Sequence, residues 1–524
     1  MTMLRCSCLA VLLSSCVSGD DVMSMPQPSA AMVSTSLQLH IAQGDIQGFA
    51  VDDGVRSFLG IPYAQAPLGA LRWQAPVPQP AWVGLRQVTQ WSARCPQAGS
   101  HGQPNALESE DCLYLNVWAP STASALPVMV WIHGGGNVDG TASDEALNGK
   151  LLAARFGVVV VSLNYRLGVL GFMSHPNLAA AGGGALGNQG LRDQQLALRW
   201  VHDNIAVFGG DPEKVTIFGE SAGASDVCLH MVAPASRGLF ARALGESGGC
   251  TTRRKLVSDA VPQGTMLAQQ LGCGDVDPLA CMRAKSVQDV FTAADALGAS
   301  GVSFGPVVDG DVTPDQPRTL YDHDAIAQVP YLIGSNTDEG TGFTLDATGI
   351  TDDAGYLEAL RVRLLLPADQ VAALYPVSAF QTHPDPYQAA VARAWGDRSL
   401  VCTTLDVAQR TAAAGLPVFM YNFDMPLDGS AGVWGAAHAT EIVFVFGTKP
   451  DFTPEERAVS DRMQRYWTQF AKTGDPASPE LEAWPRFTKA QDVRVNFGVN
   501  TTVLHDFRMT ECQFWSAQYD QAFQ

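Results

Sequence analysis

Two short runs in this 524-residue sequence have the composition of the turn that carries a serine nucleophile. Residues 219–223 read Gly-Glu-Ser-Ala-Gly and residues 245–249 read Gly-Glu-Ser-Gly-Gly, so both match the pattern G-x-S-x-G. That pattern needs a strand, a tight turn and then a helix. Ser221 follows the strand-like run 215–218 and precedes a segment suited to a helix, whereas Ser247 has a poorer strand before it and a poor helix start after it. We therefore predict that Ser221 is the nucleophile and that Ser247 has a structural role.

A second glycine-rich run could stabilise the negative charge that develops during acyl transfer. Residues 133–136 read His-Gly-Gly-Gly and directly follow the apolar run 126–132. Glycine has no Cβ, so its backbone N–H can approach a substrate oxygen closely. We expect Gly135, Gly136 and the N–H of Ala222 to form an oxyanion hole. The alternative is a plain glycine turn.

A serine nucleophile on a strand–turn–helix motif of this kind needs a carboxylate and a histidine, which follow it in the order serine, acid, histidine. The histidines that follow Ser221 are His230, His323, His383, His438 and His505. His230 would lie on the helix that begins at the nucleophile and could not turn back toward it. His438 lies among small residues that suit an exposed base. Spacing alone does not choose among the carboxylates, of which Asp338 and Glu339 follow a short apolar strand.

The elements that would position these residues alternate along the chain. Apolar runs over 126–132, 158–163 and 215–218 read as buried strands, and apolar side chains recur at helical spacing over 191–205. A second amphipathic helix is expected over 461–472. The strand–helix–strand order predicts an α/β fold, with a mainly parallel central sheet flanked by helices.

Composition excludes some classes of function. The hydrophobic fraction of 46% allows a large core, and the formal net charge of -19 would repel a nucleic-acid backbone. No Cys-x-x-Cys or Cys/His spacing suggests a metal site, and we expect neither a metal nor another cofactor.

The N-terminal residues resemble an export signal. Residues 1–15 hold a positive charge and then an apolar core too short to span a bilayer. Residues 13–16 read Leu-Ser-Ser-Cys, which resembles a bacterial lipobox, so we expect Cys16 to carry a lipid anchor. The alternative is an ordinary signal peptide in which Cys16 is incidental. Residues 16–36 read as a flexible tether and residues 37–524 as one domain. The protein would then be exported to a bacterial envelope, or be periplasmic or secreted, with membrane contact only through the anchor.

Further motifs carry a resemblance to a known family. They lie at residues 58–64, 109–116, 164–168, 208–212, 218–224 and 467–476. With these motifs the chain resembles the type-B carboxylesterase family, which includes cholinesterases and bacterial broad-specificity esterases, from about residue 37 onward. The resemblance implies an α/β-hydrolase fold and a serine carboxyl-ester hydrolase acting on small to medium neutral esters. The family's acid falls on Glu339 and its base on His438, so that His438 would take the Ser221 proton and Glu339 would orient the imidazole.

The resemblance also assigns cysteines and ion pairs. It implies three disulfides, Cys95–Cys112, Cys273–Cys281 and Cys402–Cys512, and leaves Cys228 and Cys250 as reduced, buried thiols. It identifies Arg72–Glu110 and Arg166–Asp193 as structural ion pairs.

The chain departs from the family in three places. Residues 96–111 form a shorter loop with no aromatic residue, so a quaternary-ammonium site is disfavoured. Asn137 follows the glycine run where the family usually has Phe, and we expect it to reshape the entrance. Ser300 and Val302 stand where acetyl-preferring cholinesterases carry bulky rings, which predicts a roomier acyl pocket unless another side chain fills the gap.

Two other functions fit parts of this pattern. A catalytically inactive adhesion or scaffold module is disfavoured because Ser221, Glu339 and His438 are all present. An amidase or a lactonase would use the same three residues.

Overall fold

The computed structural model describes residues 37–51, 54–97, 107–180, 186–274, 277–364, 366–427 and 434–523. The predicted signal peptide, the tether and Cys16 lie outside these residues. Within them, no helix is both long enough and apolar enough to cross a membrane.

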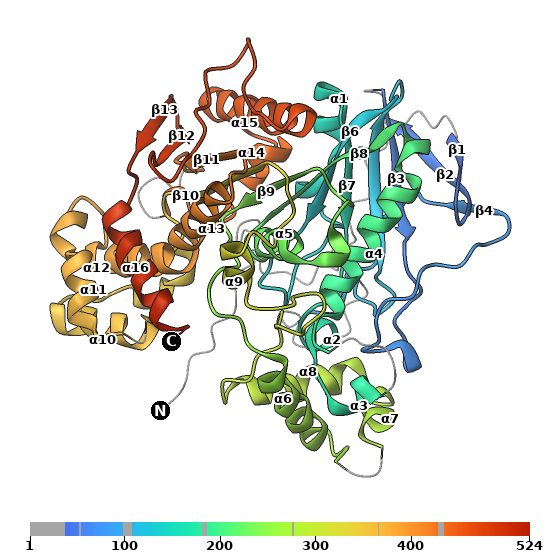
Figure 1. Cartoon of the computed structure of the whole chain (residues 1–524), viewed down its shortest axis with the longest axis horizontal. Helices are drawn as coiled ribbons and strands as arrows, with labels where there is room; N and C mark the ends of the chain where they lie inside the picture. The colour runs from blue at the N-terminus through green and yellow to red at the C-terminus, as the bar shows by residue number, and fades with distance from the viewer. Residues whose placement is uncertain are drawn as a thin grey trace, which may run out of the picture.

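A thirteen-stranded sheet organises the described residues (Figure 1). Its strands run β1-β2-β3-β5-β7-β6-β8-β9-β10-β11-β12-β13, and β4 pairs with β2. Pairing is parallel from β7 through β6, β8, β9, β10 and β11 to β12. The strand bounds are β1 Leu37–Ile41, β2 Gly44–Val51, β3 Val55–Pro62, β4 Leu85–Gln87, β5 Tyr114–Pro120, β6 Leu126–Ile132, β7 Val159–Leu163, β8 Gly210–Glu220, β9 Arg242–Glu246, β10 Tyr331–Asn336, β11 Val418–Phe423, β12 Val493–Phe497 and β13 Thr501–His505.

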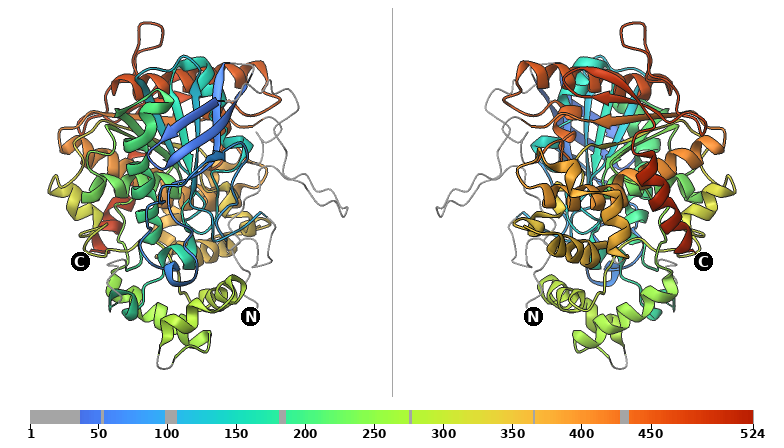
Figure 2. Two further views of the ribbon diagram at one scale, coloured as in Figure 1. Left: turned by 90° about the vertical axis from the view of Figure 1, so that its right-hand side faces the viewer. Right: turned by 90° about the vertical axis from the view of Figure 1, so that its left-hand side faces the viewer.

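Antiparallel strands close both ends of the sheet. The hairpin of β1 and β2 continues through β3 and β5 at one end, and β13 pairs with β12 at the other. The two views of Figure 2 show these opposite ends. The central parallel strands are therefore shielded from edge-to-edge pairing with another chain.

Helices cover both faces of the sheet, as a parallel sheet requires. Their bounds are α1 Lys150–Phe156, α2 Gly168–Phe172, α3 Pro176–Ala180, α4 Gln189–Asn204, α5 Ala222–Val232, α6 Val257–Gln270, α7 Pro278–Arg283, α8 Val287–Gly298, α9 Pro317–Asp322, α10 Asp353–Leu364, α11 Ala368–Leu374, α12 Pro386–Gly396, α13 Cys402–Ala413, α14 Ile442–Phe446, α15 Pro454–Thr473 and α16 Met509–Gln521.

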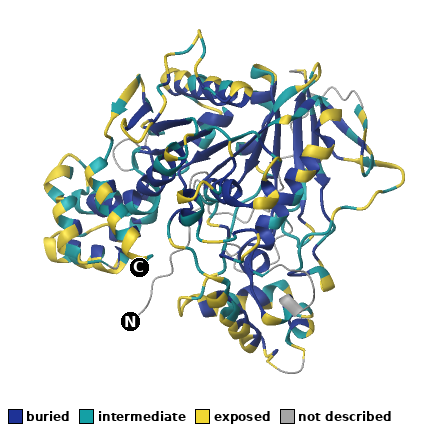
Figure 3. Cartoon of the chain, in the orientation of Figure 1, coloured by how far each residue is buried: buried dark blue, intermediate teal, exposed yellow. Residues whose placement is uncertain are grey.

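The central strand β6 shows how the sheet divides the core. Val128 and Val130 pack in the cluster that includes residues of α4, α5 and α13, whereas Met129 and Trp131 pack in the cluster that includes residues of α1, α14 and α15. Successive strand side chains point to opposite faces, so one apolar run supplies both clusters. Figure 3 shows this buried centre in dark blue. A third cluster joins α2, α6, α7 and α8, which gather at the bottom of Figure 1.

The expected α/β fold with a mainly parallel sheet is confirmed. The predicted strands correspond to β6, β7 and β8, and the helix expected over 191–205 is α4. The helix expected over 461–472 is α15, which begins earlier, at Pro454. A capping box between Thr453 and Glu456 sets that start, because each side chain bonds the backbone of the other.

Disulfides among the described residues include the three expected pairs, Cys95–Cys112, Cys273–Cys281 and Cys402–Cys512. The expectation that Cys228 and Cys250 are reduced thiols is wrong, because these residues form a fourth disulfide. Disulfides are typical of oxidising compartments outside the cytoplasm.

The packing of two turns explains the Cys228–Cys250 disulfide. A Cβ at Gly248 would lie only 2.3 Å from Ser221 O, so the segment after β9 runs against the start of α5. Ser225 Oγ then donates to Gly249 O at 3.0 Å. Cys228 lies one helical turn beyond Ser225 and meets Cys250 there, a proximity that chain spacing alone does not reveal.

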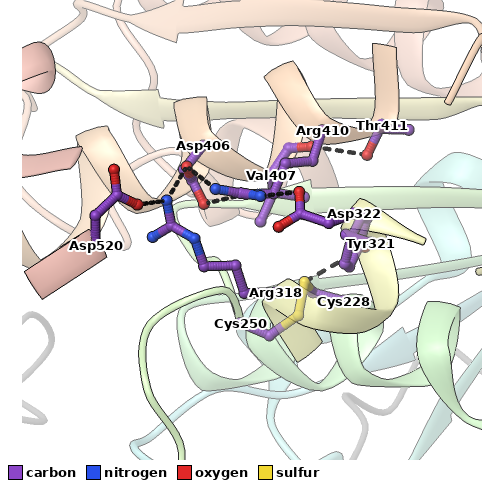
Figure 4. Close-up of polar contacts among 10 residues, drawn as sticks. All are labelled: Cys228, Cys250, Arg318, Tyr321, Asp322, Asp406, Val407, Arg410, Thr411 and Asp520. Atoms are coloured by element: carbon purple, nitrogen blue, oxygen red, sulfur yellow. Dashed lines mark hydrogen bonds and ion pairs between the residues drawn. A yellow bond between two sulfur atoms is a disulfide. The ribbon is translucent and has the colours of Figure 1, made fainter. Parts of the chain in front are cut away.

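Ion pairs connect the helices around this disulfide (Figure 4). The Tyr321 hydroxyl on α9 lies 3.5 Å from Cys228 Sγ. Arg318 of α9 pairs with Asp520 of α16 and, at 3.9 Å, with Asp406 of α13, and Arg410 of α13 pairs with Asp322 of α9. These contacts fix α9, α13 and α16 to one another.

The two ion pairs expected to be structural are present. Arg72 donates to both oxygens of Glu110, at 2.6 and 2.5 Å, and Arg166 donates to both oxygens of Asp193, at 2.8 and 2.6 Å. All four side chains are mostly buried. Removing one partner of a buried pair typically costs about 3–5 kcal/mol.

Candidate active site

Ser221 lies in a sharp turn between β8 and α5. Its φ is 57°, in the left-handed region that is unusual for a residue with a Cβ. The strand ends at Glu220 and the helix begins at Ala222, so the turn is a single residue. Ser221 N donates to Glu246 O at 2.8 Å, which ties the turn to the neighbouring strand β9. This is the local geometry that the G-x-S-x-G pattern predicts.

Ser247 adopts the same φ, 57°, at the end of β9. The strand before it is better formed than the sequence indicates, because β9 pairs with both β8 and β10. No helix follows directly, however, since α6 begins only at Val257. Ser247 is fully buried, and its Oγ donates to Glu441 Oε1 at 3.2 Å. These contacts fit the structural role predicted for it.

The loop after β6 lies against the nucleophile turn. A Cβ at Gly134 would lie 2.7 Å from Glu220 O and 3.1 Å from Ser221 Cβ, so only glycine allows this approach. Gly135 and Gly136 follow with positive φ values of 93° and 65°. In the described part of the chain, the N–H groups of Gly135, Gly136 and Ala222 donate no hydrogen bond to a protein acceptor.

Glu339 and His438 form a direct pair. His438 Nδ1 lies 2.6 Å from Glu339 Oε2, and the other carboxylate oxygen accepts from Asn336 N at 2.7 Å. Glu339 is 1% exposed. Its two oxygens therefore have fixed partners, and the imidazole cannot rotate without losing a bond.

The topology of the sheet explains why residues distant in sequence meet. The segments of Gly135, Ser221, Glu339 and His438 follow β6, β8, β10 and β11, which are parallel to one another. The carboxyl ends of parallel strands lie at one edge, where the loops of α/β proteins form their sites.

Asp338 joins the loop of Glu339 to the loop of His438. Its N–H donates to Ala436 O at 3.0 Å, and its Oδ2 accepts from Ala436 N at 3.0 Å. Arg393 donates to the other oxygen of Asp338 at 3.0 Å. His438 lies two residues after Ala436, so these bonds fix its position relative to Glu339.

The second nitrogen of His438 meets the residue that precedes the nucleophile. Its Nε2 lies 3.1 Å from Glu220 Oε1. Within the described residues, no hydrogen bond joins Ser221 Oγ to His438. The imidazole is thus placed between two carboxylates, one of which is adjacent to Ser221 in the chain.

Further buried carboxylates surround this pair. Glu246 Oε1 accepts from Trp467 Nε1 at 2.7 Å, and Glu441 accepts from Asn336 Nδ2 and Ser247 Oγ. Glu220, Glu246 and Glu441 are all at most 3% exposed. Several buried carboxyl groups therefore lie close together beneath the surface of the site.

The pKa values of these groups reflect burial and mutual charge. Burial would lower the pKa of His438, but the carboxylates of Glu220 and Glu339 together raise it to about 10. Burial raises the pKa of Glu220 to about 8, although His438 opposes the shift. Burial, reinforced by Glu339, raises the pKa of Glu441 to about 7. At neutral pH the cluster therefore retains protons that isolated carboxyls would release.

Aromatic side chains lie beside His438. The Phe343 ring centroid is 5.1 Å from that of His438, and Trp395 stacks on Phe343 at 4.3 Å. Ser300, expected at the acyl pocket, is exposed after the end of α8, and Val302 packs half-buried against the cluster that contains α8.

Some polar residues at the site were not singled out by sequence reasoning. Glu220 and Glu441 lie inside the motifs around Ser221 and His438, at positions where the motif fixes no role. Only the Glu220–His438 distance of 3.1 Å shows that Glu220 lies beside this imidazole. Asp226 and Trp395 give no signal in a single sequence. In the described residues, no group of three or more His, Cys, Asp or Glu side chains could hold a metal ion.

Comparison with known proteins identifies the family. The sequence matches the carboxylesterase family over residues 35–515. It is 34% identical over 526 residues to the acetylcholinesterase of Bungarus fasciatus, covering 92% of this chain and 86% of that protein. It is 36% identical over 504 residues to the cholinesterase of Mus musculus, covering 88% of this chain and 83% of that protein. The chain therefore belongs to the carboxylesterase family and is a serine hydrolase of carboxylic esters with an α/β-hydrolase fold.

Proposed function

We propose that this protein hydrolyses small to medium neutral carboxylic esters through an acyl-enzyme on Ser221, with His438 as the base and Glu339 as the acid. One observation carries the proposal. The His438 imidazole is bound at Nδ1 by Glu339, and its Nε2 faces the residue next to Ser221. A base that is fixed at one nitrogen and directed toward the nucleophile turn is what acyl transfer requires.

The first half of the reaction forms the acyl-enzyme. Ser221 Oγ attacks the ester carbonyl carbon while His438 Nε2 takes the hydroxyl proton, and Glu339 stabilises the imidazolium through Nδ1–H. The N–H groups of Gly135, Gly136 and Ala222 stabilise the oxyanion, and their lack of protein acceptors supports this role. The intermediate then expels the alcohol, which receives the proton from His438.

The second half releases the acid. His438 removes a proton from water, the hydroxyl attacks the acyl carbon, and Ser221 leaves with the proton that His438 returns. The sum is ester plus water giving acid plus alcohol, and no cofactor is needed. Apo active sites often hold their catalytic hydrogen bonds loosely, so contact between Ser221 and His438 is expected to form when substrate binds.

Neutral esters are favoured over choline esters. The relatives named above are cholinesterases, and a quaternary ammonium group is bound by aromatic faces. Residues 96–111, in which residues 98–106 lie outside the described part, contain no aromatic residue. Kinetics with a butyryl choline ester and a neutral butyryl ester should therefore favour the neutral ester, and matched amides and lactones would test the two alternative activities.

A serine-directed phosphonate tests the nucleophile. Ser221→Ala should abolish both ester hydrolysis and labelling, because no other residue replaces the attacking oxygen. Ser247→Ala is the matched control, since Ser247 has the same backbone strain in a buried turn, and it should still be labelled at Ser221. Mass spectrometry of the labelled peptides gives the result, and an adduct on Ser247 would overturn the assignment.

We also propose that Cys16 carries a lipid anchor. The support is the run Leu-Ser-Ser-Cys at residues 13–16, since these residues lie outside the described structure. Two or more acyl chains anchor a protein stably, whereas a single chain binds only marginally. Cys16→Ser should move the protein to the soluble fraction, and a mature N-terminus elsewhere without acyl mass would rule the anchor out.

A further inference from the structure

The two proposed halves of the oxyanion hole come from different elements. Gly135 and Gly136 belong to the loop after β6, whereas Ala222 begins α5 after β8. Three donors can stabilise one oxygen only when their separation is held to a fraction of an ångström, because electrostatic catalysis depends on preorganised groups. A contact between the loop and the helix must therefore maintain this spacing.

Asn137 is placed to make that contact. It directly follows Gly136, is 5% exposed and has a φ of 57°. Its side chain lies in the interior, where Nδ2 donates to Asp226 Oδ2 at 2.7 Å. Its backbone oxygen accepts from Gly168 N at 2.7 Å, so both ends of the residue are fixed.

Asp226 lies on α5 one helical turn after Ala222. It is fully buried, and its Oδ2 also accepts from Gln194 Nε2 at 2.7 Å. Gln194 is held in turn by His230, whose Nε2 lies 2.8 Å from Gln194 Oε1. Within the described residues, Asp226 Oδ1 has no hydrogen-bond partner. Burial of a carboxylate costs free energy unless hydrogen bonds compensate for the lost hydration. A link with only a structural role could be made at a lower cost in folding free energy.

We propose that the Asn137–Asp226 hydrogen bond is a positioning contact that sets the spacing between the Gly135–Gly136 donors and the Ala222 donor. The bond joins the residue after one donor pair to the helical turn after the other donor. The inference rests on the proposed function, because it concerns the oxyanion hole of that reaction. It assigns Asn137 and Asp226 no contact with the reacting atoms.

Other contacts hold other parts of the loop that follows β6. The Tyr165 hydroxyl donates to His133 O at 2.9 Å, and its ring stacks on His133. Gln97 donates to Gly140 O and accepts from Gly140 N at 3.2 Å. Those contacts lie at the two ends of the loop and on other elements. Among the hydrogen bonds of the described residues, the bond from the Asn137 side chain joins this loop to α5, and otherwise the two approach each other only through backbone packing at Gly134 and Gly223.

Removal of the Asn137–Asp226 hydrogen bond should reduce catalysis more than substrate binding. Asn137→Gly is the sharpest change, because glycine accepts a φ of 57° without strain and only the amide is lost. We expect kcat to fall about 10- to 100-fold while KM changes less than about threefold, since a small misplacement affects the transition state most. Affinity for a trifluoromethyl ketone, which forms a charged tetrahedral adduct, should fall in parallel with kcat/KM.

Two further variants separate positioning from general stability. Asp226→Asn keeps an oxygen that can accept from Asn137 and should restore most of the kcat lost in Asp226→Ala. The double variant Asn137→Gly/Asp226→Ala should be no slower than the slower single variant, because both single variants already remove the Asn137–Asp226 bond. Asn204→Ala is the control: Asn204 is 2% exposed and bonds Ala42 N and Trp200 O at the far end of α4, so its kcat should stay unchanged.

Failure of this inference is distinguishable from failure of the proposed function. If the native enzyme hydrolyses esters and Ser221→Ala does not, but Asn137→Gly keeps full kcat, the positioning role is wrong while the function stands. An increase in KM at constant kcat, or additive losses in the double variant, would also overturn it. If the native enzyme neither turns over esters nor reacts with a phosphonate at Ser221, the proposed function itself fails.

Discussion

Glu220 occupies the unspecified position of the G-x-S-x-G motif, and its carboxyl group lies close to His438, the proposed base. Its Oε1 lies 3.1 Å from His438 Nε2, the nitrogen that accepts the Ser221 proton in the proposed reaction. A general base is active only in its neutral form. A carboxylate at this distance stabilises the protonated form, so we predict that Glu220 sets the pH at which the proposed base becomes active.

Glu220→Gln should therefore shift the pH profile. The pKa of His438 is raised to about 10 by Glu220 and Glu339, against the opposing effect of burial. Loss of the Glu220 charge removes one cause of the increase, so the acid limb of kcat/KM should move to lower pH by roughly one unit or more. The measurement is kcat/KM for a neutral ester across the pH range.

Glu246→Gln is the matched control for that experiment. Glu246 pairs with Glu220 across β8 and β9 and is equally buried, but its side chain bonds Trp467 and makes no contact with His438. Its substitution should leave the acid limb in place. An unmoved limb in Glu220→Gln, or equal shifts in both variants, would mean that Glu220 does not control the base.

At the scale of residues, sequence reasoning was most useful where a motif also constrains the backbone. The strained turn at Ser221 could be predicted from the flanking small residues and the preceding strand, and the structure contains it. Glu339 could not be separated from Asp338 by spacing, and only family resemblance chose it. The structure distinguishes the two by partner, since Glu339 bonds His438 while Asp338 bonds Arg393 and Ala436.

At the scale of elements, we predict that the acyl specificity depends on the segment after α8. We predict that the small residues Ser300 and Val302 leave room for longer acyl chains, unless the stacked Phe343 and Trp395 beside His438 fill that space. Each buried methylene is worth roughly 0.8 kcal/mol. Butyryl to hexanoyl esters should therefore exceed acetyl esters in kcat/KM by about tenfold if two methylenes are buried.

The test is a series of esters with one alcohol and acyl chains of increasing length. Val302→Phe should reverse the preference toward acetyl, whereas Val503→Phe, on the edge strand β13, should leave it unchanged. A monotonic decrease from acetyl upward in the native enzyme would contradict an open pocket.

Helices and strands were predictable where a single hydrophobic pattern dominates the segment. The apolar runs of β6 and β7 are buried on both faces, so composition alone marks them as central strands. The strand β9 was underestimated because its residues, Arg-Ala-Leu-Gly-Glu, are strand-like only in the context of β8 and β10. The Cys228–Cys250 disulfide was missed for a related reason, since it depends on how one turn packs against another.

At the scale of the whole molecule, buried acidic groups couple folding to pH. The protein carries a formal net charge of -19, and part of its carboxyl content is buried at the site. Burial raises the pKa of Glu220 to about 8 and those of Glu441 and Asp226 to about 7. In the unfolded chain these groups would titrate near their ordinary values of about 4.

The direction of this pH effect follows from the number of protons bound by the folded and the unfolded states. Between pH values of about 4 and 8 the folded state holds more protons on these carboxyls than the unfolded state, so the free energy of unfolding falls as pH rises. His438 acts in the same direction from about pH 6.5 upward, because its folded pKa is raised. Burial lowers the pKa values of His133 and His230 to about 4, which opposes the trend, but only below about pH 6.5.

The free energy of unfolding should therefore decrease between about pH 6 and 8, by roughly 1.4 kcal/mol per pH unit for each excess proton. Urea unfolding at several pH values measures this slope. Repulsion among the exposed charges of this acidic protein would give the same sign, but salt screens exposed charges and acts much less on buried ones. The slope should persist in high salt and become shallower in Glu441→Gln, which removes a buried titrating group while keeping an oxygen that Asn336 can bond. A slope that disappears in salt, or that Glu441→Gln leaves unchanged, would place the pH dependence at the surface rather than in the buried cluster.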